Sequence, residues 1–194
     1  MHGPDVLVRE NRQQDGRYWP AMLVFDGLTG RLRHVVGLPE ERRTDRDPLL
    51  VAGHLVVAWR DARGAPLLTA HTLATGEAAW RRSLPGDGRV SALVRSDRAD
   101  ELVVLQEDGY LGTYGISDGK PRGRTRIYVG EGRGAWPFHQ TTLLADAERV
   151  FLMPRSPRPP AQVGAWDRAT GKLLWVTPWD GEERNPGRSA LGLT

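Results

Sequence analysis

The stretch WDRATGKLLW, from Trp166 to Trp175, contains the pattern that decides the fold of this chain. Its Thr-Gly-Lys can belong either to a phosphate-binding loop or to a tight turn between two strands. A phosphate-binding loop of the Walker type needs GxxxxGK, then Ser or Thr, with a helix behind it. Here the first glycine is absent, and the apolar Leu173 and Leu174 follow the lysine. We therefore predict a hairpin turn, in which Lys172 is an exposed charge and not a phosphate ligand.

Four copies of this pattern occur along the chain, so an internal repeat is the first feature to explain. The turn glycines are Gly30, Gly76, Gly119 and Gly171. Five positions before them stand the ring residues Phe25, His71, Tyr114 and Trp166. Four positions after them stand His34, Trp80, Gly123 and Trp175. The third copy is therefore the most degenerate.

Short apolar runs typical of strands accompany each copy. One series begins at Val6, Leu55, Leu102 and Val150, with spacings of 49, 47 and 48 residues. A second series begins at Leu49, Ser91 and Thr141. Each repeat is thus predicted to consist of three strands, the glycine turn and a fourth strand. Four short antiparallel strands in a repeat of this length are the unit of a β-propeller blade.

The residue types around each glycine explain how the turn would close. An Asp four positions before it, as at Asp26 and Asp167, can accept hydrogen bonds from backbone N–H groups two or three residues later. The glycine supplies the positive φ that a short hairpin needs. We expect the two ring positions of one hairpin to share a face as diagonal neighbours and to pack between adjacent blades.

Two of the segments, VGAWDRATGKLLW and LLTAHTLATGEAAW, resemble the repeats of the pyrroloquinoline-quinone-like propeller superfamily, whose blades close with Ala-x-Asp-x-x-Thr-Gly-Lys-x-x-Trp. The resemblance covers nearly the whole chain and is strongest in the second and fourth units. It implies an all-β fold, with residues 1–194 forming a single β-propeller domain of four blades. It implies no single function, because the superfamily includes quinone-dependent dehydrogenases, outer-membrane assembly scaffolds and many interaction domains.

The first repeat is short of one strand, and this raises the question of how the propeller closes. The tail Arg188–Thr194 resembles Arg89–Ser96 and is predicted to complete the first blade. Completion within one molecule gives a closed four-bladed ring. Completion by a second molecule gives a head-to-tail homodimer, each chain being half of an eight-bladed ring. A third alternative is that the chain is part of a longer one. An open half-ring by itself would expose two blade faces to water.

Composition excludes several classes of protein. The chain has 27 Lys and Arg against 24 Asp and Glu, a net charge of only +3, so a nucleic-acid partner is not expected. It has no cysteine, which excludes disulfides, thiolate catalysis and cysteine-ligated metals. No apolar run approaches the roughly 20 residues of a membrane helix, and no signal peptide is recognisable. We expect a cytoplasmic protein from the sequence as written, or an extracytoplasmic one if it is a fragment.

The sequence favours binding over catalysis. The resemblance implies that quinone-dependent relatives hold their cofactor and calcium with residues from most of an eight-bladed ring, whereas this chain has half the blades. The segment GRSAL, residues 187–191, lacks the last glycine of a GxSxG nucleophile motif. The five histidines show no short metal-ligand spacing. We therefore expect no enzyme activity, no cofactor and no metal.

Loops at one rim of the propeller supply the predicted binding residues. The segment VGEGRGAWPFHQ combines glycines with an arginine and rings, PRSPRPP is stiff and basic, and WRDARGAP occupies an equivalent connection. The predicted binding residues from these loops are Arg60, Arg63, Arg133, Trp136, Arg155 and Arg158. The leading hypothesis is a non-catalytic scaffold that presents these loops to a protein or peptide. The alternative is a small-molecule or carbohydrate site, with or without catalysis, in the central channel of a completed propeller.

Overall fold

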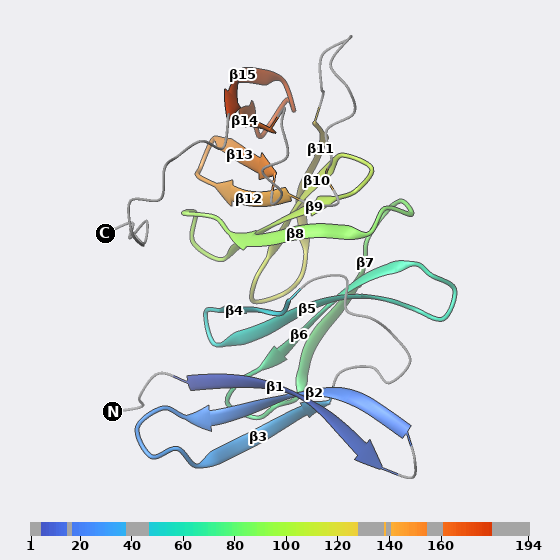
Figure 1. Ribbon diagram of the computed structural model, residues 1–194, viewed down its shortest axis with the longest axis vertical. Helices are drawn as coiled ribbons and strands as arrows, with labels where there is room; N and C mark the ends of the chain where they lie inside the picture. The colour runs from blue at the N-terminus through green and yellow to red at the C-terminus, as the bar shows by residue number, and fades with distance from the viewer. Residues whose placement is uncertain are drawn as a thin grey trace.

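The described residues form four antiparallel sheets that follow one another along an arc (Figure 1). The computed structural model describes residues 5–14, 17–37, 47–127, 138, 141–154 and 161–179. Within these ranges the chain forms fifteen strands and no α-helix. Accordingly, no helix of the described part is long and apolar enough to cross a membrane. The all-β prediction is confirmed.

Each sheet is an up-and-down meander, in which strands that are consecutive in the chain pair side by side. The first sheet contains β1 (Asp5–Gln14), β2 (Arg17–Asp26) and β3 (Leu32–Gly37). The second contains β4 (Leu49–Val51), β5 (His54–Arg60), β6 (Pro66–Thr72) and β7 (Ala78–Ser83). The third contains β8 (Val90–Arg95), β9 (Glu101–Gln106), β10 (Tyr110–Gly115) and β11 (Pro121–Arg126). The fourth contains β12 (Thr141–Ala145), β13 (Arg149–Pro154), β14 (Ala161–Asp167) and β15 (Leu173–Trp179).

All four glycine turns are hairpin turns of one geometry. Gly30, Gly76, Gly119 and Gly171 have φ values of 66°, 75°, 63° and 71°. In each turn the glycine N–H donates to the carbonyl four residues earlier, over 2.7–3.0 Å. The left-handed backbone explains why glycine stands there, because a Cβ raises the energy of this conformation. The prediction that Thr-Gly-Lys forms a turn is therefore confirmed.

Aspartates close two of these turns as predicted. The Asp26 carboxylate accepts the N–H groups of Leu28 and Thr29, each over 2.9 Å. The Arg33 guanidinium has the largest effect on the pKa of Asp26 and, together with these N–H groups, holds it far below its ordinary value. Asp167 accepts both the hydroxyl and the N–H of Thr170, and these bonds likewise lower its pKa. The two carboxylates therefore remain charged at any physiological pH.

The prediction that the two rings of one hairpin share a face is wrong. In the fourth sheet, Trp166 lies opposite Val150 and Leu173. Trp175 instead lies opposite Ala165, the neighbour of Trp166, and neighbouring strand residues point to opposite faces. The cause is a β-bulge, which places one extra residue in the outermost strand and moves the second ring to the other face. The same register shift occurs in all four hairpins.

Three apolar cores join the four sheets, one at each junction of neighbouring sheets. Fully buried pairs across the successive junctions include Val24 and Leu55, Val56 and Leu102, and Val103 and Leu152. The first and fourth sheets lie at opposite ends of the arc (Figure 1). The sheets are not closed into a ring. The open arrangement of the described sheets agrees with the predicted half of a propeller and not with a ring closed within one chain.

In the first two blades the ring four positions after the turn glycine faces the next blade. The Cβ of His34 lies 3.4 Å from the place where a Cβ on Gly76 would be. The Trp80 ring lies so close to Gly119 that an added Cβ would be 2.6 Å from it. Trp80 also donates its Nε1–H to the carbonyl of Ile116 over 2.7 Å. The prediction that these rings pack between blades is confirmed for the first two junctions.

The strand predicted to complete the first blade lies outside the described residues, because the structure describes nothing beyond Trp179. The first sheet has three described strands, whereas each of the others has four. Completion of the first blade by Arg188–Thr194 therefore stays a prediction.

Candidate binding cleft between the third and fourth blades

The junction between the third and fourth blades lacks the contact of a ring on a turn glycine that the first two junctions have. Its ring position is occupied by Gly123, which has no side chain to insert. The turn at Gly171 instead lies directly on the backbone of β11, where an added Cβ would overlap the carbonyl oxygen of Arg126. The fourth blade is thus held by backbone contact at the point where the earlier blades hold a ring.

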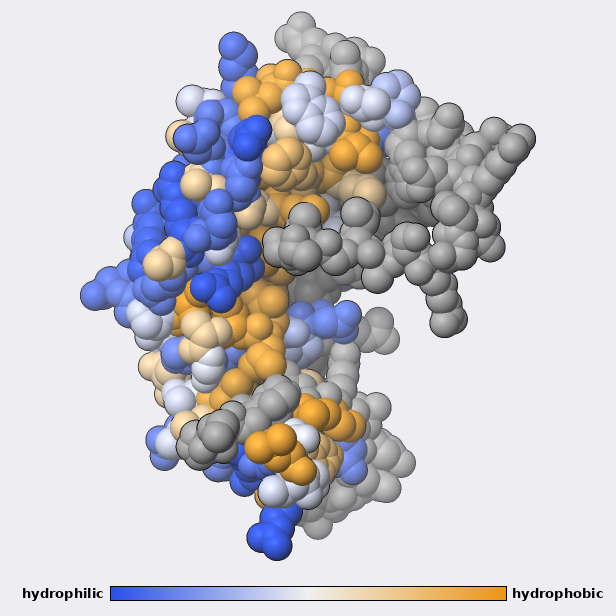
Figure 2. All heavy atoms as spheres, turned by 90° about the vertical axis from the view of Figure 1, so that its left-hand side faces the viewer, coloured by the Kyte–Doolittle hydropathy of each residue, from blue (hydrophilic) through white to orange (hydrophobic). Residues whose placement is uncertain are grey.

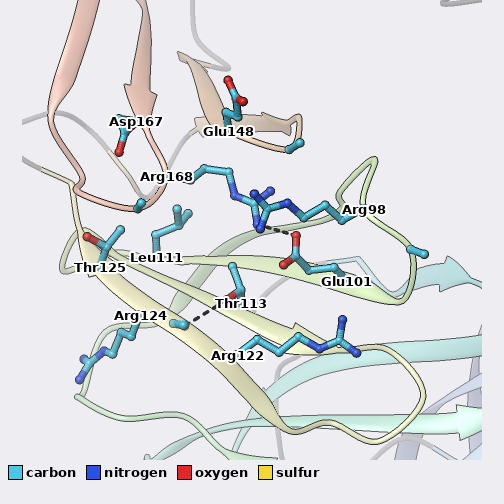
Figure 3. A pocket seen from close by; sticks show the side chains of 14 residues that line it. Arg98, Glu101, Leu111, Thr113, Arg122, Arg124, Thr125, Glu148, Asp167 and Arg168 are labelled. Carbon is cyan, nitrogen blue, oxygen red and sulfur yellow. Dashed lines mark hydrogen bonds and ion pairs between the residues drawn. The ribbon is translucent and has the colours of Figure 1, made fainter.

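A cleft of about 690 Å³ opens beside this contact (Figure 3). Residues of the third blade, including Gly123, form one wall. The turns β12–β13 and β14–β15 of the fourth blade form the other wall. A volume of this size is typical of ligand pockets. The junction with the degenerate repeat therefore has space for a ligand.

A buried ion pair forms the floor of the cleft. The Nη2 of Arg168 lies 2.5 Å from the Oε1 of Glu101, and each side chain is only 6% exposed. Arg168 also donates from Nη1 to the hydroxyl of Ser96 over 3.0 Å. Charges this deeply buried are retained when they are paired and hydrogen-bonded. The pair therefore fixes the floor and links the third blade to the fourth.

The repeat shows how unusual this arginine is. Arg168 stands three positions before its turn glycine, and the equivalent residues of the second and third blades are Leu73 and Ile116. Both of those are buried apolar residues of the preceding junction. Sequence reasoning missed Arg168 and Glu101, although a charge at a repeat position that is otherwise apolar was a signal that could have found Arg168.

Opposite charges line the two walls. The third blade contributes Arg98 and Arg122, and the fourth contributes Glu148 and Asp167. The side chain of Arg124 points away from the cleft, toward the second blade (Figure 3). In Figure 3, Arg98 extends from the β8–β9 turn toward the ion pair on the floor. The arginine side chains at the cleft, those of Arg98, Arg122 and Arg168, equal its three carboxylates in number. The cleft is therefore polar, with a basic wall facing an acidic one.

One of the wall arginines is held in place by neighbours. Arg122 forms an ion pair with Asp100, which also accepts the N–H and the hydroxyl of Ser117. The Arg122 side chain is accordingly ordered before any ligand arrives.

The described side chains of the cleft can bind polar ligands. Among the described residues no group of three or more His, Asp or Glu side chains could hold a metal ion. The described lining offers guanidinium groups, carboxylates and the hydroxyls of Thr113 and Thr125. These groups form salt bridges and hydrogen bonds with polar ligands.

The residues predicted from sequence lie elsewhere or outside the described part. Arg60 donates to the carbonyls of Gly64 and Asp87, each over 2.8 Å, and so ties the β5–β6 loop to the β7–β8 loop. Arg63 is exposed in the β5–β6 loop. In an up-and-down sheet this loop lies at the opposite strand ends from the turns that line the cleft. The other predicted residues lie outside the described residues: Arg133, Trp136, Arg155 and Arg158.

Comparison with solved structures identifies the class of fold. The computationally designed Ika8 protein superposes with a TM-score of 0.51 and 17% sequence identity, over 86% of this chain and 48% of that one. BamB from Moraxella catarrhalis superposes with a TM-score of 0.50 and 15% identity, over 89% of this chain and 65% of that one. Both are β-propeller proteins, and at these identities the likeness shows the fold alone. This chain has a β-propeller-like fold and spans about half of the first chain and less than two thirds of the second.

Comparison at the level of sequence gives no family assignment. No protein-family model matches the chain, and no curated protein matches it at a significant level.

Proposed function

We propose that this chain is a non-catalytic β-propeller scaffold that binds a segment of a protein or peptide in the cleft between the third and fourth blades. The observation that carries the proposal is the replacement of a ring by Gly123 at this junction, with a charged cleft beside it. The apolar core and the buried ion pair hold this junction together, and the vacant ring position beside them leaves space for a ligand.

The charges of the cleft indicate the kind of segment. Arg98 and Arg122 form a wall that attracts carboxylate side chains, because guanidinium groups bind carboxylates through paired hydrogen bonds. Glu148 and Asp167 on the other wall accept hydrogen bonds from backbone or side-chain N–H groups. An acidic peptide lying along the cleft satisfies both walls.

The ordering of the basic wall supports binding with little reorganisation. Asp100 restrains Arg122. Side chains that are already ordered lose less conformational entropy when a ligand binds, which favours affinity. Arginine is also among the residue types that contribute most at protein interfaces.

Selection from a displayed random-peptide library tests the proposal. We expect the chain to enrich peptides with Asp or Glu, and the charge reversal Arg98→Glu to weaken a selected peptide at least tenfold, about 1.4 kcal/mol, in fluorescence polarisation. Arg98 is exposed, so this variant should fold normally. Binding should also weaken as the salt concentration rises, because charges attract the peptide.

The matched control is Arg63→Glu, an exposed arginine on the predicted loop face. It should leave peptide binding unchanged. Loss of binding in Arg63→Glu but not in Arg98→Glu would assign the site to the loops and reject the cleft. Enrichment of no peptide, together with binding of oligosaccharides on a glycan array, would favour the small-molecule alternative.

Two finer assignments belong to the same proposal. We place the chain among the pyrroloquinoline-quinone-like propellers, which the four Thr-Gly or Asp-Gly hairpins and the likeness to BamB support. The loop residues of the sequence prediction, Arg60 and Arg63 with the four that lie outside the described residues, remain a second proposed face for a protein partner.

A further inference from the structure

The fourth sheet ends the arc with an apolar face that none of the other described sheets covers. The exposed fractions of Leu144, Met153 and Trp175 are 54%, 37% and 45%. The pairing register puts all three on one face, opposite to the face that contacts the third blade. Phe151 belongs to it too, with its ring centre 6.3 Å from that of Trp175. We call these four residues the forward face.

The same positions are buried where a next blade is present. In the second sheet, Ala58 and Trp80 are the repeat equivalents of Met153 and Trp175. Their exposed fractions are 1% and 9%, because the third blade covers them. The forward face of the fourth sheet therefore has the composition of a junction, without the blade that would bury it.

The first sheet has the complementary uncovered face at the other end. Val6 and Val8 are 49% and 43% exposed, and they pair with Phe25 and Leu23 on the side away from the second blade. Their repeat equivalents, Leu55 and Val57 among them, are at most 1% exposed. We call Val6, Val8, Phe25, Leu32 and Val35 the backward face. In Figure 2 apolar side chains come to the surface at both ends of the arc.

The contact of ring on glycine is also left open at both ends. In the first two junctions the ring of one blade lies against the turn glycine of the next, His34 on Gly76 and Trp80 on Gly119. Trp175 is the last ring of the series and is exposed. Gly30 is the first turn glycine, and nothing lies within 4 Å of the place where its Cβ would be. Among the described residues, the ring of Trp175 thus has no turn glycine packed against it, and Gly30 has no ring packed against it.

We propose that two copies of this chain join head to tail at both ends, so that the forward face of each covers the backward face of the other and Trp175 lies against Gly30 of the second copy. The junction continues the interface that the chain already makes three times within itself. The sheets of one copy are not closed into a ring, and a second copy supplies the blades that close it. A heterologous interface that closes after two copies gives a dimer and not a filament.

The occupant is a second copy because both faces occur on every chain and match the faces of an internal junction position by position. Apolar surface of this kind is rarely left in water by a monomeric protein. This inference does not depend on what the cleft binds, since the cleft lies within one chain, between its third and fourth blades.

Molar mass by light scattering gives the first test. We expect twice the 21.5 kDa of one chain, and a shift to the monomer in Trp175→Glu. The matched control is Leu174→Glu. Leu174 is 48% exposed and occupies the bulge position, whose equivalent Ala79 stays exposed although a next blade is present. This control should remain a dimer. A wild-type monomer at all concentrations, or a dimer that survives in Trp175→Glu, would overturn the proposal.

Cross-linking through introduced cysteines tests the proposed contact. The chain has no native cysteine, so only the introduced residues can form a disulfide. A chain with Gly30→Cys and Trp175→Cys should oxidise to a covalent dimer. Either substitution alone should stay monomeric on a denaturing gel, because equivalent residues do not meet in a head-to-tail pair. A ladder of higher oligomers, or a covalent dimer from Trp175→Cys alone, would reject the closed ring. Peptide binding measured on the same samples separates failure of this inference from failure of the cleft proposal.

Discussion

The substitution Gly171→Ala is expected to destabilise the fold by about 2–4 kcal/mol. About 1 kcal/mol comes from placing a Cβ at a φ of 71°. Roughly 1–3 kcal/mol more comes from overpacking, because the added Cβ overlaps the carbonyl of Arg126 and the fourth blade must move away from β11. Urea denaturation followed by fluorescence measures the change in the free energy of unfolding.

Gly53→Ala is the control for this substitution. Gly53 has a φ of 75°, nearly that of Gly171, but nothing lies within 4 Å of its added Cβ. The backbone penalty is therefore the same in both variants, about 1 kcal/mol, and only the contact differs. Equal losses of stability in the two variants would show that the Gly171 turn does not rest on the third blade.

Removing Arg168 is expected to have an effect of similar or greater size. Arg168→Ile leaves the Glu101 carboxylate buried without its partner, which typically costs about 3–5 kcal/mol. The double variant Arg168→Ile with Glu101→Leu should recover most of the loss, because Ile116 shows that an apolar residue suits this repeat position. A double-mutant cycle in urea gives the coupling energy between the two side chains.

Two results of that cycle would contradict the structure. A loss below about 1 kcal/mol for Arg168→Ile would mean that the pair is solvated, as exposed pairs are. Additive losses in the double variant would mean that the two side chains do not interact. Each single variant also reports on the cleft, since its floor would be disturbed while the arginines of the wall remain.

The strand order and the turns could be predicted because their causes are local. A turn glycine with positive φ and the aspartate four positions before it, Asp26 or Asp167, define a hairpin within six residues of sequence. Regular spacing of apolar runs then gives the number of blades. The bulge could not be predicted in this way, since the spacing of Trp166 and Trp175 fits either face of the hairpin, depending on whether one extra residue is accommodated.

The cleft could not be predicted, because its parts are distant in the sequence. Arg168 and Glu101 are brought together only by the packing of two blades, and nothing in their sequence positions indicates that they form a pair. Gly123 marked the third repeat as degenerate, but a missing ring is equally consistent with loose packing. The loop residues were chosen by residue type alone, and Arg60 shows the weakness of that criterion, because its guanidinium ties two loops of its own chain together.

The central claim is that each of the first two blades places its second ring on the turn glycine of the next blade. A disulfide across one junction tests it most directly, in the variant His34→Cys with Gly76→Cys. The two Cβ positions are 3.4 Å apart, close to the separation that disulfides require, and the bond should form within one chain under mild oxidation. The companion variant Phe25→Cys with Gly76→Cys should stay reduced, since the bulge turns Phe25 to the opposite face. Failure of the first pair to cross-link, or equal cross-linking of the second, would contradict this account of the fold.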